Sequence, residues 1–130
     1  MTDGHDRVNR FGAWSMGLAR VGAGAACLVA PKKTVAAWVS RETAAQPGVD
    51  LVARALGIRE LILGAAILNS LARGGNGRAW LAAAALADVT DGAATLAARH
   101  QLRPARALLV TAVAAGSAAV GAHLAWRLDA

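Results

Sequence analysis

The hydrophobic positions of the chain fall into four blocks of about 20 residues each, separated by short polar segments. These blocks span residues 11–31, 51–72, 79–98 and 107–128. A run of about 20 apolar residues crosses the ~30 Å hydrocarbon core of a bilayer as an α-helix. None of the blocks has the wide polar face that a water-exposed helix needs. The pattern therefore predicts an all-α fold in which four transmembrane helices form an up-down bundle with short loops.

The segments outside the blocks fit the same prediction. Residues 1–10 form a polar tail that we expect to be disordered or interfacial, and residues 11–128 form the single domain. The Gly-rich turn at 73–78 joins the second and third blocks as an antiparallel hairpin. In the longest connector, residues 34–40 are expected to form a short interfacial helix that turns Val35 and Trp38 toward lipid.

Tryptophans lie near the ends of the predicted helices. In an up-down arrangement Trp14, Trp80 and Trp126 fall on one side of the membrane, and Trp38 falls on the other. Trp is enriched at the interface between lipid and water. The pattern therefore predicts a multi-pass protein of the cell (inner) membrane, with the lipid bilayer as its first partner.

Composition supports a membrane protein and bears on the alternatives. The chain is 56% hydrophobic, above the roughly 45–50% of soluble domains, and its mean hydropathy is +0.42. A soluble Ala-rich bundle stays open as an alternative, because Ala is only weakly hydrophobic and the blocks contain charges. The formal net charge of +6 is spread over every loop without interleaved aromatic residues, so nucleic acid is not expected as a partner. Lys and Arg are almost evenly divided between the two sides, which leaves the orientation undecided.

Six ionisable residues interrupt the apolar blocks, three of each sign. They are Arg20, Arg54, Arg59, Glu60, Asp88 and Asp91. An Asp or Arg at the centre of a membrane helix costs about 2.5–3.5 kcal/mol on insertion, so these charges need partners. Counted from the helix ends, all but Arg54 fall at one depth, and Arg54 is close enough to the end of its block to snorkel to the interface.

Two interpretations of this charged layer remain open. In the first, Arg20 and Arg59 pair with the two aspartates and fix the register of the helices. In the second, the layer is a functional site, because intramembrane ionisable residues are functional candidates by default. The candidate catalytic residues are Asp88, Asp91 and Glu60, and the candidate binding residues are Arg20, Arg54 and Arg59.

Other polar residues give weaker signals. His123 lies near the end of the last block and is expected to be interfacial rather than a ligand for haem or metal. Ser117 and Thr111 are expected to hydrogen-bond to their own helix. Cys27 is the only cysteine, so the chain forms no internal disulfide.

No cofactor or metal is expected. The carboxylates are matched by as many arginines, and the chain has no Glu-x-x-His pair of the kind that holds a di-iron centre. The run DVTDG at 88–92 resembles the start of the CDP-alcohol phosphatidyltransferase signature, but Thr95 and Leu96 replace the Ala-Arg pair that follows in that family. A two-metal site would then lack half of its ligands.

A resemblance covers most of the chain. The marks are an Arg-x-x-Gly-x-Arg-Glu core at 54–60 followed by Gly64, Pro31 at the end of the first block, and Asp88 or Asp91 in the third. The chain resembles small bacterial four-helix membrane proteins with a domain of unknown function, distantly similar to DoxX-like proteins. The resemblance implies a four-helix fold and a membrane location, and it implies no particular activity.

Three classes of function follow from these observations. The first is a binding or transport module in which arginines hold an anionic or polar group and a carboxylate exchanges protons. The second is a membrane-embedded acid–base enzyme, such as an isomerase or cyclase, acting on a lipophilic substrate. The third is a partner in a larger membrane complex, docking through small residues such as Gly17, Gly24, Gly116 and Gly121. A homodimer is considered under the first class, and whether the protein is an enzyme is left open.

Overall fold

Helices make up nearly the whole chain in the computed structural model, which describes residues 2–128. The elements are α1 (Thr2–Val29), α2 (Pro31–Trp38), α3 (Arg41–Ala44), α4 (Val49–Ala72), α5 (Arg78–Ala97), the 3-10 helix η1 (Arg99–Gln101) and α6 (Pro104–Arg127). No strand occurs within residues 2–128. The predicted all-α class is confirmed.

The long helices agree with the four hydrophobic blocks, and the main difference lies in α1. Residues 2–10, expected to form a polar tail, are helical and extend α1 at its start, while Met1 lies outside the described residues. Arg10 explains part of this order. Its guanidinium donates to Gly75 O at 3.3 Å and to Leu71 O at 3.4 Å, which ties the beginning of α1 to the end of α4.

The predicted short helix in the long connector is present, with different bounds. It begins at Pro31 rather than at residue 34, because proline fits the first position of a helix, where no backbone N–H is needed. The single-turn helix α3 follows it. The side chain of Ser40 caps α3 by accepting a hydrogen bond from Thr43 N at 3.0 Å.

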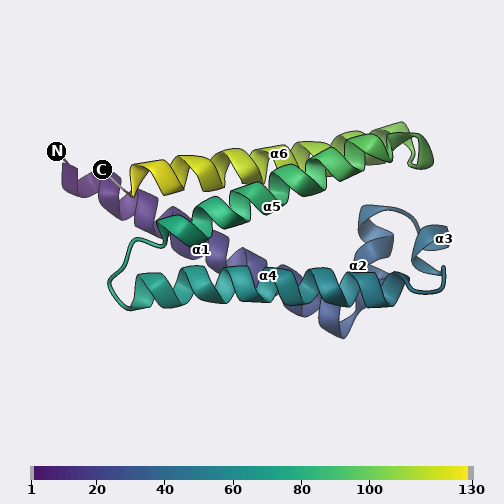
Figure 1. The fold of residues 1–130 in the computed structure, drawn as a ribbon, viewed down its shortest axis with the longest axis horizontal. Helices are drawn as coiled ribbons and strands as arrows, with labels where there is room; N and C mark the ends of the chain where they lie inside the picture. Colours follow the sequence, from purple (N-terminus) through teal and green to yellow (C-terminus); the bar gives the residue numbers. More distant parts are fainter. Residues whose placement is uncertain (1, 129–130) are drawn as a thin grey trace.

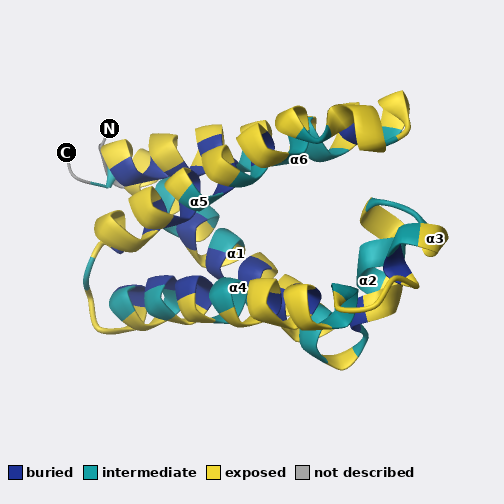
Figure 2. Ribbon diagram, turned by 45° about the vertical axis from the view of Figure 1, so that its right-hand side comes forward, coloured by how far each residue is buried: buried dark blue, intermediate teal, exposed yellow. Residues whose placement is uncertain are grey.

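The four long helices form two antiparallel pairs, α1 with α4 and α5 with α6. Figure 1 shows that the pairs meet where both chain termini and the α4–α5 turn lie. Toward the opposite end, which holds α2, α3 and the α5–α6 link, the pairs diverge, as Figure 2 shows from a second side. The α4–α5 turn is made possible by Gly74 and Gly77, whose φ angles of +81° and +68° suit glycine.

The apolar core shared by both pairs occupies only the end where they meet. It contains residues from all four long helices: Ala13, Leu63, Ile67, Leu71, Leu81, Ala84, Leu124 and Ala125. Every one of them lies in the half of its helix next to the α4–α5 turn. In the other half, therefore, no common core fills the space between the two pairs.

Much of the outer surface is apolar. Val29, Phe11, Leu51 and Leu108 are each more than two-thirds exposed. The accessible surface of 8125 Å² exceeds the roughly 6,400 Å² expected for a compact soluble monomer of this mass. Such an area of exposed apolar surface calls for cover by lipid or by another protein.

Judged by length and composition alone, two helices are long and apolar enough to cross a membrane. They comprise residues Gly4–Val29 within α1 and Pro104–Arg127, which is α6. The sequence pattern predicts four such spans, so this measure supports half of them. The other two long helices, α4 and α5, carry carboxylates and arginines near their middle.

Candidate functional site

Close packing between α1 and α4 is set by glycines. A Cβ added to Gly24 would lie 2.6 Å from Gly57 O, and one added to Gly64 would lie 2.7 Å from Gly17 O. Both distances are shorter than real Cβ contacts, so the backbones touch at these two points. The glycines of each helix are seven residues apart, which places them on one face two turns apart. Only glycine allows this approach.

Arg20 lies between the two glycine contacts and crosses from α1 to α4. Its Nη1 donates to Glu60 Oε2 at 2.6 Å. The Arg20 side chain is 6% exposed and that of Glu60 is 16% exposed. An ion pair is therefore built into the same contact that the glycines create.

The α5–α6 pair has the same organisation. Small residues meet on both sides of one polar contact: a Cβ on Gly121 would lie 3.3 Å from Ala85 Cβ, and a Cβ on Gly92 would lie 3.5 Å from Ala114 Cβ. Between these contacts Ser117 Oγ of α6 donates to Asp88 Oδ2 of α5 at 2.6 Å. Each helix pair thus encloses one buried polar contact within a small-residue seam.

Arg20 joins the two pairs. Its Nη2 donates to Asp88 Oδ2 and, at 3.4 Å, to the carbonyl oxygen of Ala84. The same nitrogen lies 3.5 Å from Ser117 Oγ. One guanidinium on α1 therefore reaches groups on α4, α5 and α6.

A second bridge connects α4 to α5. Arg59 holds Asp91 in a bidentate arrangement, with Nη1–Oδ1 at 2.9 Å and Nη2–Oδ2 at 2.5 Å. Arg59 Nη2 also donates to Glu60 Oε1 at 3.0 Å. Two-point pairing of this kind is the strongest arginine–carboxylate geometry.

These contacts form one continuous chain, called the ionic network below. Its members are Arg20, Arg59, Glu60, Asp88, Asp91 and Ser117. The network becomes more exposed from one end to the other: side-chain exposure rises from 11% at Asp88 to 34% at Arg59 and 40% at Asp91. The network also borders the shared apolar core, at the level where the helix pairs begin to diverge.

The charges of the ionic network do not balance. It contains two guanidinium groups and three carboxylates, so its net charge is −1 when all are ionised. Arg20 Nε and Arg59 Nε are buried and have no hydrogen-bond partner among the described residues. The network therefore has an uncompensated negative charge together with two unused N–H donors.

The residues predicted to meet at one depth do so, with Arg54 as the expected exception. Arg54 lies near the start of α4, where its Nη1 donates to Leu28 O at 2.7 Å. Six ionisable residues are neutral as a set, but Arg54 takes no part in the network, and one negative charge is left over. The assignment of the network residues to catalytic or binding roles remains a prediction.

Ser117 is the residue that sequence reasoning missed. It was expected to bond to its own helix, but instead it donates to Asp88 on the neighbouring helix. The signal available in the sequence was its depth, which matches that of Asp88 in an antiparallel α5–α6 hairpin. The expectation for Thr111 is also wrong, because its buried hydroxyl has no partner among the described residues. His123 is exposed on α6, in keeping with an interfacial position.

Small residues proposed for docking to other proteins are mostly used within the chain. Gly17 and Gly24 pack against α4, and Gly121 packs against α5. Of the four candidates only Gly116 faces open space, with nothing within 4 Å of an added Cβ. The predicted docking face of four glycines is therefore wrong.

The surroundings of the ionic network bear on which ligands it could take. Within the described residues no group of three or more His, Cys, Asp or Glu side chains is placed to hold a metal ion. Two grooves occur near the diverging ends of the helices, one lined by Leu96 and Thr111 and the other by Lys33 and Arg54. Neither is lined by a carboxylate of the network. The chemistry available at the network is proton or cation exchange on a carboxylate.

Comparison with known proteins adds no assignment. No family model, no curated protein and no solved structure matches the chain.

Proposed function

We propose that this chain is a multi-pass integral membrane protein in which α1, α4, α5 and α6 all cross the bilayer. The four helices contain 28, 24, 20 and 24 residues, and each is long enough for the hydrocarbon core. In α4 and α5 the central charges pair with one another in the ionic network, which lowers the cost of placing them in lipid. Large apolar side chains cover the outside of the bundle.

The ends of the helices fit membrane interfaces. Trp80 and Trp126 lie close to the α4–α5 turn and are 44% and 70% exposed. Trp38, 44% exposed, lies in α2 at the opposite end. These are positions where amphipathic indole rings favour the boundary between lipid and water. The resemblance to small four-helix, distantly DoxX-like membrane proteins is part of the same proposal.

Within this membrane protein, the ionic network acts as a binding site for a proton or a small monovalent cation. The observation that carries this proposal is the excess of one carboxylate, since three carboxylates share two guanidinium groups. An uncompensated charge at mid-depth in lipid is expensive, and a proton or cation on the network removes it. Asp91 is the most exposed member, so exchange with the surroundings takes place at its end of the network.

Infrared spectroscopy of the reconstituted protein tests the proposal at neutral pH. In a buffer free of alkali cations, the native protein should show the C=O stretch of one protonated carboxyl group. Asp91→Asn removes the excess carboxylate, so this band should be lost. Asp6→Asn removes an exposed carboxylate outside the network and should leave the band in place.

The response to alkali cations decides between the two ligands. Loss of the band on adding Na⁺ or K⁺ identifies a cation that replaces the proton, and an unchanged band identifies a proton site. The proposal is overturned if the native protein shows no protonated carboxyl in cation-free buffer. A band that persists in Asp91→Asn would overturn it as well.

The other two functions have weaker support. An acid–base enzyme would need a substrate cavity at Glu60, Asp88 or Asp91, and none of these residues lines either groove described above. A role as a partner in a complex is favoured only by the extent of exposed apolar surface, which lipid also covers. We therefore place the proton- or cation-binding module first.

A further inference from the structure

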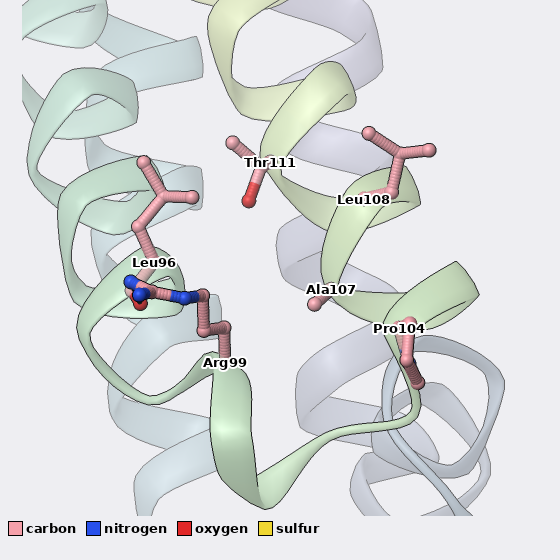
Figure 3. A pocket seen from close by; sticks show the side chains of 6 residues that line it. All are labelled: Leu96, Arg99, Pro104, Ala107, Leu108 and Thr111. Atoms are coloured by element: carbon pink, nitrogen blue, oxygen red, sulfur yellow. Dashed lines mark hydrogen bonds between the residues drawn. The ribbon is translucent and has the colours of Figure 1, made fainter.

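A groove lies between the end of α5 and the start of α6. The helices pack closely at Gly92 and Ala114, and the groove lies between that point and the link that contains η1. The groove has a volume of about 360 Å³ and is lined by Leu96, Arg99, Pro104, Ala107, Leu108 and Thr111. Figure 3 shows these side chains on the two facing helices.

The lining combines apolar walls with two polar groups. Leu96, Ala107 and Leu108 supply hydrocarbon surface along the groove. The Thr111 hydroxyl points into the space between the helices (Figure 3) and has no hydrogen-bond partner among the described residues. A buried hydroxyl left without a partner is unfavourable by about 1–3 kcal/mol. A ligand that accepts a hydrogen bond at this point would remove that penalty.

One arginine lines the outer end of the groove, and two more lie in or next to the neighbouring link. Arg99 lines it and lies beside Leu96, whose carbonyl oxygen accepts from Arg99 Nη1 at 3.2 Å. Arg103 lies in the same link and Arg106 in the first turn of α6, where Arg106 donates to Ala37 O of α2. No acidic residue occurs between positions 92 and 128 of the sequence, and Glu42 of α3 interacts with Arg103, which does not line the groove. The charge therefore favours an anionic group next to an apolar slot.

We propose that this groove binds an anionic phospholipid of the bilayer. One acyl chain lies in the slot between α5 and α6, and the phosphate pairs with Arg99. The Thr111 hydroxyl donates to an ester carbonyl of the lipid, below the level of the phosphate. Basic pockets between membrane helices bind anionic headgroups in this manner. The proposal rests on the membrane location proposed above, and it is independent of proton or cation binding at the ionic network.

Native mass spectrometry of the detergent-solubilised protein tests the site. Phosphatidylglycerol and phosphatidylcholine with identical acyl chains are titrated separately, and the dissociation constant of the first bound lipid is measured. Phosphatidylglycerol should bind at least fivefold more tightly. Arg99→Gln should weaken its binding about fivefold, which corresponds to about 1 kcal/mol per basic side chain near an anionic headgroup.

Matched variants separate the groove from its surroundings. Arg103→Gln removes the same charge from the same link but leaves the groove lining intact, so binding should change less than twofold. Leu108→Ala should weaken binding, whereas Leu109→Ala, on the neighbouring position of α6, should not. Thr111→Val keeps the side-chain shape and removes the hydroxyl. This substitution should weaken binding of the phospholipid more than binding of a free fatty acid, because a fatty acid has no ester carbonyl.

Several results would overturn the lipid proposal. Equal affinity for the two phospholipids would show that the headgroup charge does not contribute to binding. An equal loss of affinity in Arg99→Gln and Arg103→Gln would show that the lipid does not bind in this groove. A fatty acid that binds as tightly as phosphatidylglycerol would exclude the phospholipid as the occupant. If the lipid proposal fails, the proposal of proton or cation binding at the ionic network still depends only on the infrared experiment with Asp91→Asn. Release of the protein from membranes by alkaline carbonate would instead contradict the proposed membrane location.

Discussion

At the scale of single residues, Arg20 determines how the four long helices are connected. It is the one member of the ionic network that contacts groups on three other helices, and it is almost fully buried. Asp88 is one of its partners and also accepts from Ser117. Removing one member of such a buried pair leaves the other charge uncompensated, which costs about 3–5 kcal/mol. Arg20 and Asp88 are therefore central to stability whatever the network binds.

The Ser117–Asp88 hydrogen bond is measurable with a double-mutant cycle. Ser117→Ala should lower the free energy of unfolding by about 1 kcal/mol, because it removes a hydrogen bond between helices to a charged acceptor. In an Asp88→Asn background the loss should be smaller by at least half. Unfolding is followed by circular dichroism in mixed micelles with increasing SDS.

Thr90→Val serves as the control for this cycle. The Thr90 hydroxyl donates to Leu86 O of its own helix at 2.9 Å and lies outside the network. Its effect should be the same with and without Asp88→Asn. If Ser117→Ala also lowers the free energy of unfolding by the same amount with and without Asp88→Asn, Ser117 is not coupled to Asp88.

At the scale of helices, pairing follows from where small residues lie. The glycines of α1 and α4 bring two backbones into contact and hold Arg20 and Glu60 at the distance that an ion pair needs. In a membrane the hydrophobic effect does not drive helices together, so close packing and buried polar contacts set the pairing. Sequence and geometry agree here, since each polar residue stands midway between two small ones.

Glycine-to-alanine substitutions on α1 test this explanation. Gly24→Ala places a methyl group within 3 Å of backbone atoms of α4. It should lower stability by about 1–3 kcal/mol, as overpacking does. Gly22→Ala has nothing within 4 Å, and should be neutral or stabilising because Ala favours helix. Equal effects of the two substitutions in the SDS unfolding assay would contradict the assigned α1–α4 contact.

At the scale of the whole molecule, the two helix pairs share a core at one end only. The ionic network lies next to this core, at the level where the two pairs begin to diverge. At the open end, Arg106 of α6 donates to Ala37 O of α2 and provides a link between them. The two pairs are thus joined by the shared apolar core and by the charged layer beside it.

Cysteine labelling in sealed, uniformly oriented vesicles tests the four-span arrangement. In a Cys27→Ala background, Asn76→Cys marks the α4–α5 turn and His100→Cys marks the α5–α6 link. Both positions are exposed, and they lie at opposite ends of α5. A membrane-impermeant maleimide should label one of them before the vesicles are opened and the other only afterwards. Labelling of both in sealed vesicles would contradict passage of α5 through the bilayer.

The amino-acid sequence determines the helices and the depth of their charges. Four apolar blocks specify four long helices. Because a helix rises 1.5 Å per residue, the count from each turn places Arg20, Arg59, Glu60, Asp88 and Asp91 in one layer. Pro31 likewise marks the boundary between α1 and α2, and Gly74 and Gly77 mark the α4–α5 turn, because each depends on the local backbone conformation. These features depend on neighbours in the sequence, so they can be predicted from it.

The tertiary structure decides which of these groups meet and which are left over. The direction of a side chain around its helix axis matters only once another helix lies opposite. For this reason, the sequence can place Ser117 at the same depth as Asp88, but spacing alone does not give their hydrogen bond or the unpartnered Thr111 hydroxyl. The missing countercharge of the network, by contrast, follows from the count along the helices, which already places Arg54 outside the charged layer. The divergence of the pairs is also a tertiary result, since it depends on small residues and core side chains in different helices fitting together at one end alone.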